Sequence, residues 1–292
     1  MKWNAIQPGA GVFDFEQADR VVAIARSQRA AVHGHCLVWH EAIPGWAEQA
    51  LRSGLSRDDA RHLMVDHIQR VAGRYSGQIH AWDVVNEAVE RNDHRPDGLR
   101  KSPWLQAIGP DYLALAFHAA RAADPHAKLA LADYGLEYDD VTWMQEKRAT
   151  MLQLLRGLKT AGVPIDAVSI QGHLSGEKPA AFGKGFRGFL REVAALGLEI
   201  YVTELDVNDQ KMVGSVAERD RGSALIYRQF LETALSEPAV RSVVTWGLSD
   251  RYTSKTTMFA RADGAPVRPL PFDSQLRPKP AAFAIAAAFG RI

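Results

Sequence analysis

The chain has a single cysteine, Cys36, among 292 residues, so it contains no internal disulfide. Cys36 lies in an apolar, strand-like run, which favours a buried and inert thiol. The chain also lacks any apolar run long enough to span a bilayer, and its first residues include no apolar segment of signal-peptide length. We therefore expect no membrane-embedded segment and no export by a standard signal, and the sequence leaves the compartment open.

No run of lysine and arginine stands out, and the formal net charge is only +1. Such a chain has no strong positive electrostatic field to attract nucleic acid or an anionic membrane. This favours a neutral partner such as a polysaccharide. Hydrophobic residues make up 47% of the chain and charged residues 24%, as in an ordinary globular protein. No linker divides the sequence, so we expect one domain over residues 1–292.

Strand-like runs alternate with amphipathic helical runs along nearly the whole chain, which indicates an α/β fold of parallel β/α units. The predicted strands are Ala31–Val38, Gln78–Asn86, Lys128–Tyr134, Ala167–Gln171, Leu198–Glu204 and Arg241–Trp246, with a short one at Met1–Trp3. The predicted helices are Glu16–Arg29, Ser56–Arg74, Pro110–Ala123, Val141–Ala161, Pro179–Leu196, Val216–Ser236 and Pro280–Phe289. Long segments follow the strands, where a β/α barrel builds its binding site.

Two glutamates, Glu87 and Glu204, each follow a strand-like run. The carboxyl ends of barrel strands supply catalytic side chains, and a facing pair of carboxylates can divide acid, base and nucleophile roles. Each glutamate could instead be a strand-end residue paired with lysine or arginine. Asn86 beside Glu87 and Asp206 beyond Glu204 crowd polar groups where burial is expected, which favours a site for glycosidic bond cleavage.

Other strand ends carry the residue types that bind sugars, which need flat aromatic rings for stacking and a rim of hydrogen-bonding groups. The aromatic candidates are Trp39, Tyr134 and Trp246, and the polar ones are Lys2, Asn86, Gln171 and His173. We interpret their convergence on strand ends as a sugar site.

A metal-dependent alternative arises from the His-x-His pair His33 and His35, which share one face of a strand. With His173 and Asp250 from later strand ends, they could complete a hydrolytic metal site of the amidohydrolase type. That site also requires a further histidine and a bridging lysine, for which the sequence offers no candidates.

Five ordered motifs resemble those of the glycoside hydrolase family 10 endo-β-1,4-xylanases. They are His33-Gly-His-Cys-Leu-Val-Trp-His40, Trp82-Asp-Val-Val-Asn-Glu87, Ser169-Ile-Gln-Gly-His173, Val202-Thr-Glu-Leu-Asp206 and Trp246-Gly-Leu-Ser-Asp250. The resemblance covers essentially the whole chain. It implies a (β/α)8 barrel of the TIM type that hydrolyses xylan with retention of anomeric configuration, without a metal or other cofactor.

The resemblance also implies roles for individual residues. Glu87 matches the general acid/base and Glu204 the nucleophile, with Asn86 expected to contact the sugar 2-hydroxyl. His173 is expected to orient Glu204, supported by Asp206. The expected contacts to xylan or xylo-oligosaccharides on the glycone side are Lys2, His35, Trp39, Gln171 and Trp246.

The chain departs from the family pattern in three places. It begins at the Met-Lys-Trp of a family motif, so we expect the first strand and helix, and most of the second strand, to be absent. Ser254 stands where the family usually has a second tryptophan, and Ala42 where it has glutamine. These departures predict weaker glycone subsites, and the open barrel edge predicts a homodimer that covers it. An inactive sugar-binding remnant is the competing interpretation.

Overall fold

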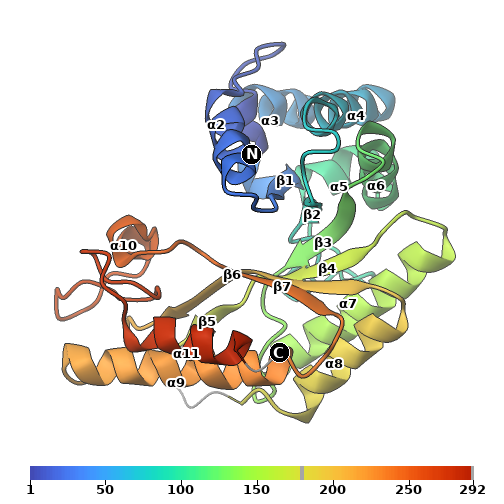
Figure 1. Cartoon of the computed structure of the whole chain (residues 1–292). Coiled ribbons are helices and arrows are strands. Elements are labelled where there is room, and N and C mark those ends of the chain that lie inside the picture. Colours follow the sequence, from blue (N-terminus) through green and yellow to red (C-terminus); the bar gives the residue numbers. More distant parts are fainter. Residues whose placement is uncertain (178–180, 291–292) are drawn as a thin grey trace. The chain divides into compact units, whose positions relative to one another are not determined.

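Strands and helices alternate through the computed structural model, which describes residues 1–177 and 181–290 (Figure 1). The chain forms two compact units. The first contains Met1–Asp133 and Thr150–Ser169, and the second Tyr134–Ala149 and Ile170–Ile292. One domain over the whole chain stays a prediction. Among the described residues, no helix has both the length and the apolar character required to cross a membrane.

The first unit contains four neighbouring strands in chain order, β1-β2-β3-β4, and β2 pairs in parallel with both β1 and β3. Its strands are β1 His33–Trp39, β2 Ala81–Asn86, β3 Lys128–Asp133 and β4 Ala167–Ile170, the last residue of which belongs to the second unit. Its longer helices are α2 Glu16–Ser27, α4 Arg57–Arg74 and α6 Tyr112–Ala123, while α7 Thr142–Thr160 is divided between the units. Every residue of β2 is buried, as expected for a parallel strand covered on both faces.

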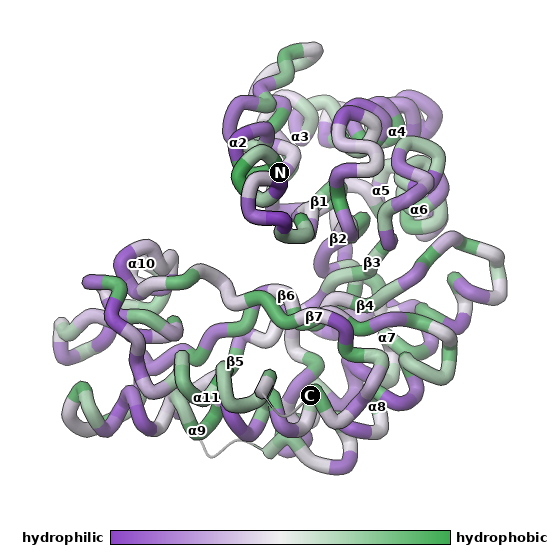
Figure 2. The backbone as a smooth tube through the Cα atoms, viewed as in Figure 1, coloured by the Kyte–Doolittle hydropathy of each residue, from purple (hydrophilic) through white to green (hydrophobic). Residues whose placement is uncertain are grey.

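The second unit is built around the ten-residue strand β6, which pairs in parallel with β5 and β7. Its strands are β5 His173–Ser175, β6 Glu199–Asn208 and β7 Val240–Thr245, and its helices are α8 Lys184–Ala195, α9 Val216–Ala234, α10 Lys255–Met258 and α11 Pro280–Phe289. A capping box between Ser215 and Glu218 begins α9. The apolar α11 packs against α9 (Figures 1 and 2).

The predicted strand at Met1–Trp3 is wrong, because a short helix, α1 Trp3–Ile6, begins there. The Trp3 indole donates to Gln7 one helical turn later at 2.9 Å, and its ring stacks on His67 at 3.7 Å. Trp104, which lies outside the predicted helices and strands, is in a short helix and stacks on Trp3 at 5.0 Å. Burial of these rings therefore overrides the strand propensity of the first residues.

Further short elements went unpredicted, and some boundaries differ from those predicted. The unpredicted helices and turns are η1 His40–Ala42, α3 Gly45–Arg52, η2 Arg91–Asp93, α5 Pro103–Ile108, η3 Asp250–Tyr252 and α10, and the unpredicted strand is β5. The predicted helix start at Pro179 lies outside the described residues, and α8 begins at Lys184. The predicted strands and helices that remain are confirmed to within a few residues, and Cys36 is buried as predicted.

Gly34 allows β1 to lie against the indole of Trp82, its register partner on β2. A Cβ atom at position 34 would lie 2.3 Å from the Trp82 ring, and the Trp82 ring is fully buried. Neither the ring nor the strand backbone has room to move away. Glycine is therefore required here for close packing.

Gly34→Ala is expected to lower the free energy of unfolding by about 1–3 kcal/mol, the usual cost of overpacking a core. Gly73→Ala is the matched control, because a Cβ there meets nothing within 4 Å and the residue lies in α4. The control should gain roughly 0.5–1 kcal/mol from helix propensity. Urea denaturation of both variants checks this, and equal stabilities would contradict the packing argument.

Candidate active site

Glu87 follows β2 in a left-handed backbone conformation, with φ of 58°. This conformation is uncommon for a residue with a side chain and is often associated with functional sites. Two hydrogen bonds hold it: the Glu87 amide donates to the carbonyl of Ala132 at 2.8 Å, and Arg100 Nε donates to the Glu87 carbonyl at 2.8 Å. The turn places the Glu87 carboxyl group near Arg100, His40 and Glu41.

Arg100 is the cation beside this carboxyl group, and the sequence did not indicate it. Its Nη2 atom lies 4.0 Å from Glu87 Oε2 and 3.2 Å from Glu90 Oε2. All three side chains are mostly buried, so these charges interact more strongly than they would at the surface. The residue lies within the long segment after β2, where no spacing rule could single it out.

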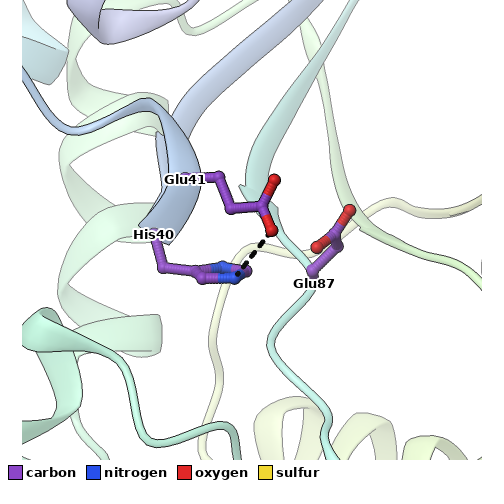
Figure 3. A group of neighbouring side chains, drawn as sticks. All are labelled: His40, Glu41 and Glu87. Carbon is purple, nitrogen blue, oxygen red and sulfur yellow. Dashed lines mark ion pairs between the residues drawn. The ribbon is translucent and has the colours of Figure 1, made fainter. Parts of the chain in front are cut away.

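His40, Glu41 and Glu87 form a second group around the same carboxyl (Figure 3), with ligand atoms within 4.8 Å of one another. His40 Nε2 lies 3.7 Å from Glu41 Oε1. Burial, and then the charge of Arg100, lowers the pKa of His40 to about 4, so its imidazole is neutral near pH 7. A neutral imidazole and two carboxylates can ligate a metal, but the Arg100 guanidinium opposes a second cation here. Absence of a metal stays a prediction.

The predicted glycone-side residues of the first unit form one cluster. Lys2 Nζ lies 4.8 Å from the centre of the Trp39 ring, and the His35 and Trp39 rings are 6.3 Å apart. Asn86 is the register partner of Trp39 on the neighbouring strand. The structure thus brings Lys2, His35 and Trp39 together, with Asn86 beside Trp39 at the carboxyl ends of β1 and β2.

His33 and His35 lie on one face of β1 as predicted, but both contact the same carboxylate. His33 Nε2 lies 2.9 Å from Asp83 Oδ1, and His35 Nδ1 lies 2.9 Å from Asp83 Oδ2. Burial would raise the pKa of Asp83, but the two imidazoles outweigh it and lower that pKa. The pair serves to hold a buried carboxylate on β2. In the second unit Asp250 accepts a hydrogen bond from Lys279 at 2.9 Å, which disfavours the metal-dependent alternative.

Glu204 and Asp206 lie inside β6, not after it, since the strand continues to Asn208. Residues two apart on a strand share a face, so both carboxylates point toward the same side. His173 Nε2 lies 3.1 Å from Glu204 Oε2, and His173 Nδ1 lies 3.1 Å from Asp206 Oδ1. The Glu204 amide donates a hydrogen bond to the carbonyl of Gln171, and the Asp206 amide donates one to the carbonyl of Gly172. These bonds fix the alignment of β6 with the segment that carries His173.

The pKa of His173 is raised to about 9, although burial alone would lower it. The hydrogen bonds to Asp206 and Glu204 outweigh that effect. The titratable groups around the His173–Asp206 pair are Glu204 on β6, Lys255 on α10, Glu137 before α7 and Tyr227 on α9. His173 is thus an imidazolium at neutral pH and donates to both carboxylates.

Trp246 and Tyr134 complete the predicted set in the second unit. The Trp246 ring meets the His173 ring edge-on at 6.0 Å. Tyr134 lies under Lys147, whose Nζ is 3.5 Å from the ring centre, and 6.4 Å from the Trp143 ring. Trp246 therefore joins the group around Glu204, whereas the ring contacts of Tyr134 are with Lys147 and Trp143.

Glu137 supports the turn that carries His173. Its carboxyl accepts from the Gly172 amide at 3.0 Å and from the Leu136 amide at 2.8 Å. Burial raises the pKa of Glu137. Gly172 has φ of 77°, which suits glycine, so the turn before β5 depends on both residues.

The fold consists of parallel β/α units, and carboxylates, amides and aromatic rings lie near the strand ends, as in an α/β enzyme. Comparison with known proteins gives the class of enzyme. The family model described as glycosyl hydrolase family 10 matches residues 1–288. Endo-1,4-beta-xylanase B of Thermotoga neapolitana is 35% identical over 285 residues, which cover 98% of this chain and 77% of that protein. The chain belongs to glycosyl hydrolase family 10.

Two further comparisons agree with this assignment. Exoglucanase XynX of Acetivibrio thermocellus is 37% identical over 298 residues, covering 98% of this chain and 25% of that protein. The crystal structure of xylanase 10B from Thermotoga petrophila RKU-1 in complex with xylobiose matches with a TM-score of 0.85 and 32% identity, covering 99% of this chain and 83% of that one. The chain is thus a glycoside hydrolase with an α/β fold of the (β/α)8 barrel class, as predicted.

The raised pKa of His173 predicts pH-dependent stability. A group whose pKa is raised in the folded state stabilises fully below its unfolded value, near 6.5, and loses that contribution as pH rises through about 9. The loss should be on the order of 3 kcal/mol. Urea denaturation at pH 6 and pH 10 measures it, with His173→Gln as the control. The hypothesis is wrong if both proteins lose the same stability over this range.

Proposed function

We propose that this glycoside hydrolase cleaves internal β-1,4 linkages of xylan and releases xylo-oligosaccharides with retention of anomeric configuration. One observation carries the proposal: the Glu204 carboxylate on β6 is held by an imidazolium that Asp206 fixes from the other side. Names of similar proteins support the substrate, since the Thermotoga neapolitana relative is an endo-1,4-beta-xylanase and the Thermotoga petrophila xylanase was solved with xylobiose.

In the first step, Glu204 attacks the anomeric carbon while Glu87 donates its proton to the departing glycosidic oxygen. The bond from the anomeric carbon to that oxygen breaks, and a glycosyl ester of Glu204 forms. Glu87, now a carboxylate, then removes a proton from water, whose oxygen displaces Glu204 and restores both groups. The mechanism requires the two carboxyl groups about 5–5.5 Å apart. Each lies in a different unit, so this spacing stays a prediction.

His173 fits the needs of this mechanism. An imidazolium that donates to Glu204 Oε2 fixes the orientation of that carboxylate before attack. The same donor stabilises the carboxylate as it leaves the sugar in the second step. Asn86 is proposed to bind the sugar 2-hydroxyl, and the remaining substrate contacts are assigned to Lys2, His35, Trp39, Tyr134, Gln171 and Trp246.

A sugar-binding protein without turnover is the competing function. Binding alone gives no reason to hold a buried glutamate against an imidazolium, which favours catalysis. Reducing-sugar release from xylan, cellulose and mixed-linkage glucan tests whether the protein turns over a polysaccharide and which of the three it prefers. Release from xylan above the other two is the expected result, and no release from any polymer would contradict the proposal.

Glu204→Ala is expected to abolish hydrolysis of xylan and of activated aryl xylobiosides, because no nucleophile remains to form the glycosyl ester. Glu87→Ala should lose activity on xylan but still react with an activated aryl xylobioside, whose leaving group needs little protonation. That variant should then stall as the glycosyl enzyme, and azide should restore turnover. Product analysis should detect the β-glycosyl azide.

Glu48→Ala serves as the control, since Glu48 is an exposed glutamate whose partner is Arg52 on the same helix. It should keep full activity on both substrates. If azide yields no β-glycosyl azide with Glu87→Ala, the role given to Glu87 is wrong. Turnover by Glu204→Ala would likewise contradict the role given to Glu204.

We also propose that two copies of the chain associate through apolar surface that each unit leaves exposed. In the second unit β7 pairs with β6 alone among the described strands, and Val244 on it is 44% exposed. Phe283 on α11 is 65% exposed. In the first unit Ile24 on α2 is 64% exposed. A strand edge without a described partner strand, and exposed apolar side chains beside it, can be covered by a second copy of the chain.

Size-exclusion chromatography with light scattering is expected to give twice the chain mass of 32.2 kDa. Ile24→Lys and Phe283→Lys should shift the equilibrium toward monomer, because a buried charge opposes association. Val213→Lys is the control, at a highly exposed position outside these elements. A monomer that binds no hydrophobic dye and unfolds cooperatively would overturn the proposal.

A further inference from the structure

Lys255, the first residue of α10, is a lysine whose side chain is only 10% exposed. Its Nζ atom lies 3.1 Å from Asp206 Oδ2 and 5.1 Å from the Phe259 ring centre. A buried ammonium group is costly unless a counter-charge lies beside it, and Asp206 is that counter-charge. The long segment after β7 thus places a cation against the residue that supports His173.

The four charged side chains form one row with alternating signs. Lys255 contacts Asp206 Oδ2, the other oxygen Oδ1 of Asp206 contacts His173 Nδ1, and His173 Nε2 contacts Glu204 Oε2, each at 3.1 Å. We propose that Lys255 is a positioning residue for Glu204, acting through Asp206 and His173. The inference deepens the proposed function and rests on the role given there to Glu204.

The first effect of Lys255 is geometric. A carboxylate has a broad torsional preference about its last bond, so one hydrogen bond leaves its plane poorly fixed. Asp206 forms a hydrogen bond with His173 through Oδ1 and an ion pair with Lys255 through Oδ2, so both of its oxygens have a partner of opposite charge. The His173 ring then presents Nε2 to Glu204 in one orientation. Without Lys255, only His173 holds Asp206, so the plane of that carboxylate and the orientation of the His173 ring are less well defined.

The second effect is electrostatic. The positive charge of Lys255 lowers the pKa of His173, opposing the larger increase from Asp206 and Glu204. With Lys255 the row of charges balances, and without it a buried negative charge is left over. The imidazolium would then be held more tightly by Asp206 and would share less of its charge with Glu204. Lys255 therefore influences how strongly His173 interacts with each of the two carboxylates, Asp206 and Glu204.

The test combines kinetics with titration of His173 by NMR on histidine-labelled protein, with His173→Gln used to assign its signal. Lys255→Met keeps the side-chain length and removes the charge. It should lower kcat on an activated aryl xylobioside about tenfold with KM changed less than twofold, and raise the titration midpoint of His173. Lys255→Arg keeps the charge and should restore most of kcat.

Lys211→Met is the matched control, because Lys211 makes an exposed ion pair with Glu177 in the same unit. It should change neither kcat nor the His173 titration. If Lys255→Met fails to fold, Lys255→Gln carries the test with the same expectations. An unmoved titration, or a loss of kcat that Lys255→Arg does not restore, overturns the inference. Because the NMR titration needs no substrate, it tells failure of this inference from failure of the proposed function.

Discussion

A buried carboxylate must be paired, and in each unit this requirement ties neighbouring elements together. On β2 Asp83 is fully buried and accepts from both His33 and His35 on β1. On β6 Asp206 is fully buried and binds His173, which begins β5. These contacts join the backbone ladder in linking β1 to β2 and β5 to β6. They also decide which side chains are held still enough to take part in chemistry.

Strand ends and the residues on them could be predicted because both depend on short segments. Parallel strands repeat an apolar run followed by polar residues, so Glu87, Asn86 and Trp246 were predicted at strand ends and lie there. The period of two placed His33 with His35 on one face. The first three residues were mispredicted because Trp3 packs on His67 and Trp104, residues far along the sequence. No local pattern records such a contact.

The counter-charges of the site could not be predicted. Arg100 lies beside Glu87 and Lys255 beside Asp206, yet each comes from a long segment with several charged residues. Choosing among those residues requires the path of the segment, which burial and turns determine. The extent of β6 was missed for a related reason. Its last four residues, through Asn208, are polar at alternate positions, and their strand conformation depends on pairing with the equally unpredicted β5.

The strands and the segments after them therefore contribute different parts of the site. Strands supply Asp83, Glu204, Asp206 and the histidines that contact them, since regular elements hold side chains more precisely than loops do. The following segments supply the cations that balance them: Arg100 after β2 and Lys255 after β7. A change in such a segment alters the charge balance without moving a strand. In the proposed mechanism the reacting carboxylates and their histidine come from β2, β5 and β6, while Lys255 lies in the segment after β7, beside Ser254.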